Sequence, residues 1–243
     1  MGTDAAVKRL ALAFSMALPC GALADEVQDA FVEANLISVF YHELGHALID
    51  VLGLPIMGQE DDAADTASIL LINATFDDDR ATEIAYYAAI AFEAESATDS
   101  PETAWDVHGA ELQRFYNLVC LFYGADVEDR EDFARDLGLP EERAETCQEE
   151  FELAIDSWGP VFDEMAEKRD GETFQFTEGQ SGMATIVIER EVGALNTLMT
   201  LPETVTVSVV TCGEANAFYN PDDKAITICS EFEDHLLQIA PND

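Results

Sequence analysis

Basic residues are scarce in this chain of 243 residues, which has 11 Lys+Arg against 50 Asp+Glu and a formal net charge of -39. Lysine occurs only at positions 8, 168 and 224. A field this negative repels nucleic-acid phosphates and anionic lipid headgroups, so we expect neither as a partner. We interpret the charge as an aid to solubility in a salty medium, where counter-ions screen self-repulsion, rather than as the mark of a specific cationic partner.

Long apolar runs are also missing, and no stretch has the length that a membrane-spanning helix needs. The chain is nevertheless 48% hydrophobic, with 14 Phe and 6 Tyr. This apolar content is too high for a disordered acidic chain and is sufficient for a packed core. The composition therefore predicts a folded protein without a membrane span.

The first 24 residues have the pattern of a secretory signal peptide. Its three parts are a basic start, a short apolar run and a small-residue cleavage site, namely Lys8 and Arg9, residues 10–18, and Ala22-Leu23-Ala24. A lipid anchor at Cys20 is the alternative, for which the preceding Leu18-Pro19 is a poor context. We expect an exported protein, periplasmic or secreted, whose mature chain is residues 25–243.

Four of the five cysteines remain after this cleavage. An even number of cysteines in an exported protein favours two disulfides over free thiols. Cys212 and Cys229 flank a predicted hairpin and form one natural pair, which leaves Cys120 and Cys147 as the other. Four buried free thiols are the alternative.

Helical spacing of apolar residues dominates the first two-thirds of the chain. It predicts helices over residues 27–52, 60–73, 79–95, 109–123, 129–137 and 141–166. Gly53 followed by Pro55 is a typical helix end. Residues 168–182 are polar and contain three glycines, which makes them the best linker candidate.

Runs typical of β-strands follow the linker candidate, over residues 184–188, 205–211 and 225–229. The last two flank the turn sequence Asn220-Pro221-Asp222-Asp223. We therefore expect one α+β domain over residues 25–243, mainly helical over 25–167, with a small antiparallel sheet from the β-rich part at 183–243.

The stretch from Phe40 to Leu48, FYHELGHAL, predicts a metal site. On a helix, His42 and His46 lie one turn apart on the same face, so both imidazoles can bind one zinc ion. Glu43 lies beside them, where it can accept a proton from a water whose pKa zinc lowers to about 7. The alternative is a satisfied pair of core histidines on an amphipathic helix.

A catalytic zinc site needs a third protein ligand and an open position for water. The acidic segment from Glu60 to Asp65 follows closely in the sequence. If it opens a helix, Asp61 and Asp65 share a face, so that one can bind the metal while the other accepts the outer N–H of a histidine ligand. An acidic helix start favoured by the macrodipole explains the same residues and is compatible with this function.

These motifs resemble a family of bacterial zinc metallopeptidases otherwise known as a domain of unknown function. The resemblance extends over most of the mature chain. Its segments are the two-His helix with Gly45, Leu54-Pro55, Gly58 and Ala64-Asp65, residues 113–118 with Cys120 and Tyr123-Gly124, and residues 212–221 with Ile226 and Cys229. More distantly, the pattern is similar to the gluzincin peptidases, which implies a zincin-like fold.

The resemblance also implies roles for individual residues. The third zinc ligand falls on Asp61, where the pattern has the longer Glu, so Glu60 is the alternative ligand. Asp65 orients a histidine, and residues 216–219 (Asn216, Ala217, Phe218, Tyr219) form an edge strand that lines the substrate cleft. Arg114 is a candidate oxyanion donor, with a structural ion pair as the alternative, and His108 is a weaker candidate.

The order of the segments differs from that of the family, in which the cysteine-flanked hairpin precedes the two-His helix. We infer a circularly permuted arrangement, which predicts that Asn216 to Tyr219 lie beside His42 in space.

The sequence thus predicts an exported zinc-dependent peptidase that acts on peptide or protein substrates. Glu43 is the predicted base and Zn2+ the predicted cofactor. One alternative is a catalytically weak or inactive periplasmic module that binds zinc or acts as a chaperone, against which the intact Glu43 argues. A purely structural zinc is the other, against which the three-ligand site argues.

Overall fold

The computed structural model describes residues 20–97, 109–167 and 171–241. The helices that precede the sheet are α1 Cys20–Leu52, α2 Glu60–Thr75, α3 Asp78–Ser96, α4 Glu111–Gly124, α5 Glu131–Asp136 and α6 Glu141–Glu167. The C-terminal elements are β1 Phe174–Glu178, α7 Met183–Leu198, β2 Val205–Val210, β3 Ala217–Asn220, β4 Ala225–Cys229 and α8 Glu231–Ile239. The predicted α+β class is confirmed.

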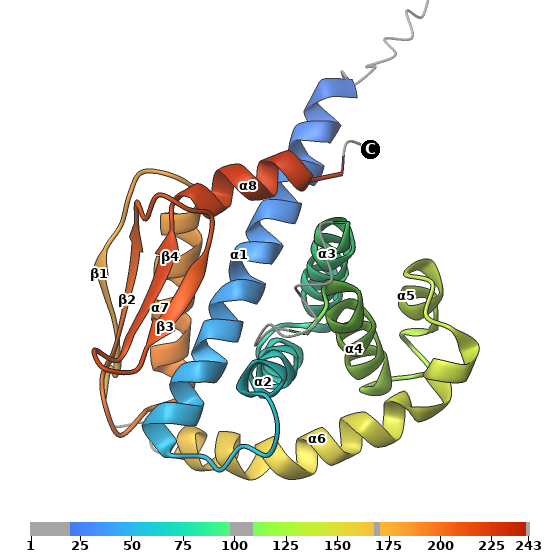
Figure 1. The fold of residues 1–243 in the computed structure, drawn as a ribbon, viewed down its shortest axis with the longest axis horizontal. Coiled ribbons are helices and arrows are strands. Elements are labelled where there is room, and N and C mark those ends of the chain that lie inside the picture. Colours follow the sequence, from blue (N-terminus) through green and yellow to red (C-terminus); the bar gives the residue numbers. More distant parts are fainter. Residues whose placement is uncertain (1–19, 98–108, 168–170, 242–243) are drawn as a thin grey trace, which may run out of the picture.

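Helix α1 forms the centre of the molecule, between the sheet with α7 on one side and α2, α3 and α4 on the other (Figure 1). Its side chains Phe31, Phe40, Tyr41 and Leu44 are completely buried. The helix ends at Leu52, and the following Gly53, with a φ of +62°, lies where the sequence predicts the end. Because α1 is in contact with both layers, residues on one of its faces contact the sheet and residues on another face contact the helices.

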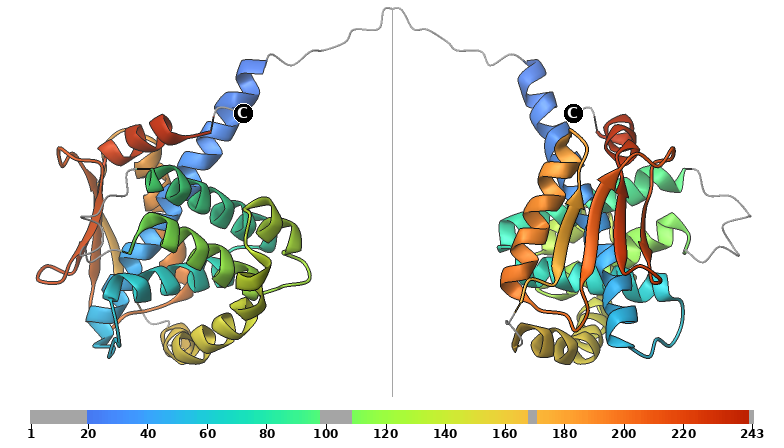
Figure 2. Two further views of the ribbon diagram at one scale, coloured as in Figure 1. Left: turned by 45° about the vertical axis from the view of Figure 1, so that its right-hand side comes forward. Right: turned by 90° about the vertical axis from the view of Figure 1, so that its left-hand side faces the viewer.

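The four-stranded sheet is mixed, with the order β1-β2-β4-β3, rather than antiparallel as predicted. Strands β1, β2 and β4 run parallel, and only β3 pairs antiparallel, with β4. The reason is that α7 crosses over between β1 and β2, a connection that parallel neighbours require. Strand β3 occupies one edge of the sheet, at the opposite side from β1 (Figure 2).

Residues 184–188, predicted as a strand, are part of helix α7. Their β-branched side chains favour a strand, but the buried positions continue at helical spacing through Ala184, Val187, Ile188, Glu191, Val192 and Leu195. Packing of this face on α1 and on the sheet overrides local strand propensity. The carboxylate of Glu233 on α8 also accepts the backbone N–H of Ala184, at 2.9 Å, at the start of α7.

Two further segments differ from expectation. The predicted linker contains strand β1, whose Phe174 is buried. The acidic C-terminal segment, for which no element was predicted, forms helix α8 with Leu236 buried. The β-rich part therefore contains two helices as well as the sheet.

Both predicted disulfides are present, Cys120–Cys147 between α4 and α6 and Cys212–Cys229 beside the β3–β4 hairpin. Residues 1–19, which make up most of the predicted signal peptide, lie outside the described residues, as does His108. The predicted cleavage site falls in the first turns of α1. Among the described helices, none combines the length and the apolar character needed to cross a membrane.

Candidate metal centre

Helices α1 and α2 pack closely against each other at Gly45. A Cβ atom at this position would lie 2.8 Å from the Cα of Ala64 and 2.9 Å from its carbonyl oxygen, closer than atoms can pack. The absence of a side chain at Gly45 therefore allows the two backbones to touch. This contact places the acidic start of α2 directly over the histidines of α1.

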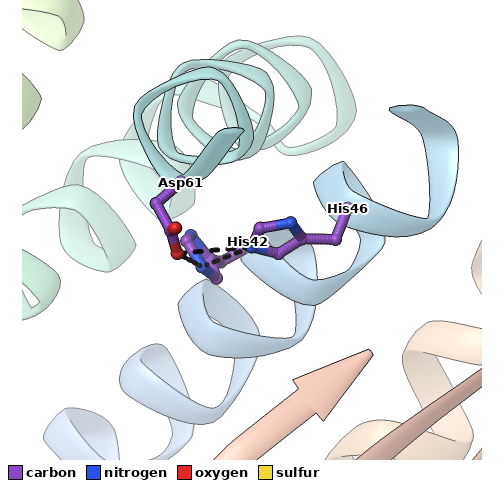
Figure 3. Close-up of side chains that lie close together, drawn as sticks. All are labelled: His42, His46 and Asp61. Atoms are coloured by element: carbon purple, nitrogen blue, oxygen red, sulfur yellow. Dashed lines mark hydrogen bonds and ion pairs between the residues drawn. The ribbon is translucent and has the colours of Figure 1, made fainter. Parts of the chain in front are cut away.

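Three ligand atoms from these helices converge: Nε2 of His42, Nε2 of His46 and Oδ1 of Asp61 (Figure 3). The two nitrogens are 3.2 Å apart, and Oδ1 lies 3.9 Å from His42 and 3.6 Å from His46. Donors about 2.0–2.2 Å from a tetrahedral zinc ion lie roughly 3.3–3.6 Å from one another. The observed separations therefore suit such an ion after small movements.

The outer nitrogens of both rings face carboxylates. Nδ1 of His42 lies 2.6 Å from Oδ1 of Asp65, and Nδ1 of His46 lies 2.8 Å from Oε1 of Glu60. When each Nδ1 donates its hydrogen outward, each Nε2 presents a lone pair inward. Two inward lone pairs at 3.2 Å repel each other unless a cation or a proton lies between them, so the arrangement favours a metal ion.

Asp65 is held in turn by Arg114 of α4. The guanidinium donates from Nε to Oδ2 at 2.8 Å and from Nη2 to Oδ1 at 2.9 Å, and it lies over the ring of Phe92. Burial alone would raise the pKa of Asp65, but the hydrogen bonds from Arg114 and His42 hold it well below its usual range. Asp65 is therefore ionised and fixed behind His42.

Burial alone would also lower the pKa of His42, but the hydrogen bond and charge of Asp65 outweigh burial and raise it. The same carboxylate that orients the ring therefore makes His42 more basic. A more basic imidazole is a stronger metal ligand, provided that the metal displaces the proton.

Glu43 is 6% exposed and lies next to the three ligand atoms. Burial raises its pKa, although the nearby histidines and the adjacent backbone of Tyr219 oppose this. Strand β3 packs against α1, and the hydroxyl of Tyr219 donates to Asp50 across this contact. The hairpin thus lies beside the two-His helix, as predicted.

A cavity of about 570 Å³ opens beside His42 and Glu43, between α1, α2, α3, α4 and α8. Arg114 lines one wall, and Asn216 with Ala217 lines another. Apolar side chains such as Ile69, Phe92 and Leu118 make up much of the remaining surface. The space is large enough to admit part of a peptide beside His42 and Glu43, and we call it the cleft.

The structure separates the predicted site residues into groups. Asp61 faces both Nε2 atoms, whereas Glu60 lies at the outer side of His46. Arg114 has the ion-pair contacts described above, and its role as an oxyanion donor stays a prediction. Asn216 and Ala217 reach the cleft, while Phe218 is 37% exposed and Tyr219 points its hydroxyl at Asp50.

Sequence reasoning missed Asp50 and Lys224, which meet Tyr219 at the end of α1. Asp50 follows Glu43 by seven residues, which is a helical spacing that places both on one face. This spacing is the sequence signal for Asp50, and it does not show which residues Asp50 contacts.

Comparison with known families gives one match. The model of the DUF4344 family, described as "Putative metallopeptidase", matches residues 20–161 and 170–242, which is most of the chain. No curated protein and no solved structure matches significantly.

Proposed function

The chain belongs to the DUF4344 family, the family described as "Putative metallopeptidase", and from this premise we propose that it is an exported, zinc-dependent peptidase. One observation carries the proposal. His42, His46 and Asp61 bring three ligand atoms within 4.8 Å of one another, beside the buried Glu43 and the cleft. Peptides or proteins are the corresponding substrates.

The donor set supports zinc as the metal. Two imidazole nitrogens and one carboxylate oxygen are typical of catalytic zinc sites, which leave a fourth position open, whereas structural sites are usually closed by four ligands. Bound zinc supplies a water nucleophile at neutral pH and polarises the carbonyl that is attacked. We assign Asp61 as the third ligand because it faces both Nε2 atoms, and Glu60 as the partner of the outer nitrogen of His46.

Glu43 is the proposed general base. A carboxylate whose pKa is raised by burial is closer to neutrality and so better suited to accept and return a proton. Asp65 and Glu60 hold the histidine rings in the tautomer that leaves Nε2 free for the metal. Strand β3, at the sheet edge beside the cleft, is the proposed surface along which an extended substrate lies.

The test compares wild type with Glu43→Gln, with bound zinc measured in each and cleavage followed on a peptide library. We expect equal zinc content and loss of cleavage in Glu43→Gln only. Glu145→Gln is the matched control, because it makes the same chemical change at an exposed position of α6 and should cleave like wild type.

Other outcomes contradict the proposal in distinct ways. Stoichiometric zinc without cleavage by wild type would support a zinc-binding or chaperone-like module instead. Purified protein without a stoichiometric divalent ion would contradict the metal centre itself. Full zinc binding by an Asp61→Ala variant would contradict only the assignment of Asp61 as the third ligand.

A further inference from the structure

A second cluster lies at the other end of the active-site face of α1. Asp50 follows Glu43 by seven residues, so the two carboxylates lie on one face of the helix, two turns apart. The Oδ2 atom of Asp50 accepts two hydrogen bonds of 2.6 Å, from the hydroxyl of Tyr219 and from Nζ of Lys224. These donors hold the pKa of Asp50 below its usual value, so its carboxylate is ionised at neutral pH.

Lys224 comes from the turn between β3 and β4. Its φ of +51° is uncommon for a residue other than glycine, and its Nζ also donates to the carbonyl oxygen of Pro221, at 2.9 Å. The side chain thus links two positions within the hairpin turn and also links the turn to Asp50. The cluster therefore joins the tip of the hairpin to the C-terminal part of α1.

Tyr219 connects this cluster to the proposed base. Its hydroxyl donates to Asp50, and its backbone lies beside Glu43 where β3 packs against α1. Residues alternate along an antiparallel edge strand, and the backbone of Asn216 is turned toward Cys229 of β4. The backbone N–H of Tyr219, three residues on, is turned the other way, away from β4.

We propose that Asp50, Tyr219 and Lys224 form a clamp that fixes β3 against α1 and thereby positions the carboxylate of Glu43. The three are positioning residues: Lys224 and Asp50 act on Glu43 through the backbone of Tyr219. The catalytic part of this inference rests on the proposed peptidase function. It also changes the expected role of Tyr219, whose side chain holds the helix and does not line the cleft.

The clamp is only partly buried, since the side chains of Asp50 and Lys224 are 30% and 25% exposed. Ion pairs this accessible to water contribute little to folding stability. A variant that lacks this ion pair should therefore remain folded while strand β3 becomes less firmly held against α1.

The principal variant is Lys224→Met, which keeps the stem of the side chain and removes its charge. Tyr219→Phe removes the hydroxyl alone and retains the backbone N–H, and Lys224→Arg is the conservative rescue. Arg135→Met is the control, because it removes an equally simple but exposed ion pair with Asp132 on α5. Each variant is assayed for zinc content, for amide hydrogen exchange of residues 216–220 by mass spectrometry, and for kcat and KM on a peptide substrate.

We expect Lys224→Met and Tyr219→Phe to bind zinc fully and to exchange the amides of residues 216–220 faster than wild type. Because a small misplacement of a reacting group is costly, kcat should fall by about tenfold to a hundredfold while KM stays within about twofold. Lys224→Arg should restore both measurements toward wild type, and Arg135→Met should change neither.

Unchanged exchange in both variants overturns the clamp. Unchanged kcat with accelerated exchange overturns the link to Glu43, and so does a raised KM at constant kcat, which would assign the cluster to substrate binding. If wild type cleaves no peptide but Lys224→Met still accelerates exchange, the clamp on β3 is supported and the peptidase proposal fails instead.

Discussion

The two histidines of the centre are held from behind in different ways. Behind His42, Asp65 and Arg114 form a two-pronged ion pair whose side chains are only 21% and 13% exposed. Behind His46, Glu60 is 53% exposed. The same chemical device, a carboxylate on Nδ1, is thus mostly buried in one half of the centre and about half exposed in the other.

This difference determines how much each half can contribute. In the interior, a low local dielectric strengthens hydrogen bonds to charged groups and fixes their geometry. At the surface, water and salt screen the same contact, and the long side chain of Glu60 loses more freedom for a smaller gain. We infer that the His42 half sets the geometry of the centre and that the His46 half adapts to it.

The largest expected effect comes from Arg114→Met, which leaves Asp65 charged and without its guanidinium partner. Removing one member of a fully buried pair costs about 3–5 kcal/mol, so for this mostly buried pair the free energy of unfolding should fall by up to that amount. Chemical denaturation at pH 7 measures it, with Arg135→Met as an exposed-pair control that should change by less than about 1 kcal/mol.

The pH dependence of this variant has a definite sign. The pKa of Asp65 is depressed in the folded state, so the pair stabilises the protein above the ordinary aspartate pKa and is lost as the pH falls through the depressed value. The difference in the free energy of unfolding between wild type and Arg114→Met should therefore be largest at pH 7 and should decrease below about pH 4. A small or pH-independent difference would contradict the description of this half as the rigid one.

Asp65→Asn is expected to weaken zinc binding by about a hundredfold, the upper end of what partners of metal ligands contribute. The amide can still accept a hydrogen bond, but it lacks the charge that makes His42 basic. Zinc competition with a chelator measures the affinity. Asp62→Asn, an exposed neighbour on α2, is the matched control and should stay within about threefold of wild type.

Features of the fold that depend on interactions between residues close in the sequence are predicted well, and those that depend on distant residues are not. Helices α1 to α6 lie within a few residues of their predicted bounds, apart from the earlier start of α1, because apolar periodicity is a local signal. Helix α7 was missed because a β-branched run outweighed the longer helical spacing, and the parallel strands were missed with it. Tertiary packing decides such cases, and no window of the sequence contains it.

The candidate site divides in the same way. His42, Glu43 and His46 are placed by one helical turn, which spacing alone describes. Asp61 and Glu60 are neighbours at a helix start, and which of them faces the rings depends on how α2 crosses α1. The contact of Lys224 with Asp50 joins residues 174 positions apart, so no local pattern announces it.

Gly45→Ala tests that crossing directly. The new Cβ would meet the backbone of Ala64, so α2 must move away and carry Asp61 and Asp65 with it. Overpacking of this kind costs about 1–3 kcal/mol, and zinc affinity should fall with stability. Gly193→Ala in the middle of α7 is the control: a Cβ there meets nothing within 4 Å, so stability should rise by up to about 1 kcal/mol. Equal behaviour of the two variants would show that close approach at Gly45 does not position the acidic residues.

The smallest expected effect belongs to Glu60→Gln, which tests the exposed half of the centre. Because Glu60 is about half exposed, its loss should weaken zinc binding by no more than about tenfold, the lower end for such partners. The difference from wild type should shrink further as salt is raised from about 0.05 M to 0.5 M, since screening already weakens the native contact. Asp65→Asn, measured in parallel, should keep most of its deficit in high salt because its pair is buried. If Glu60→Gln costs as much affinity as Asp65→Asn, or resists salt equally, burial does not distinguish the two halves, and the third-ligand role of Glu60 regains support over that of Asp61.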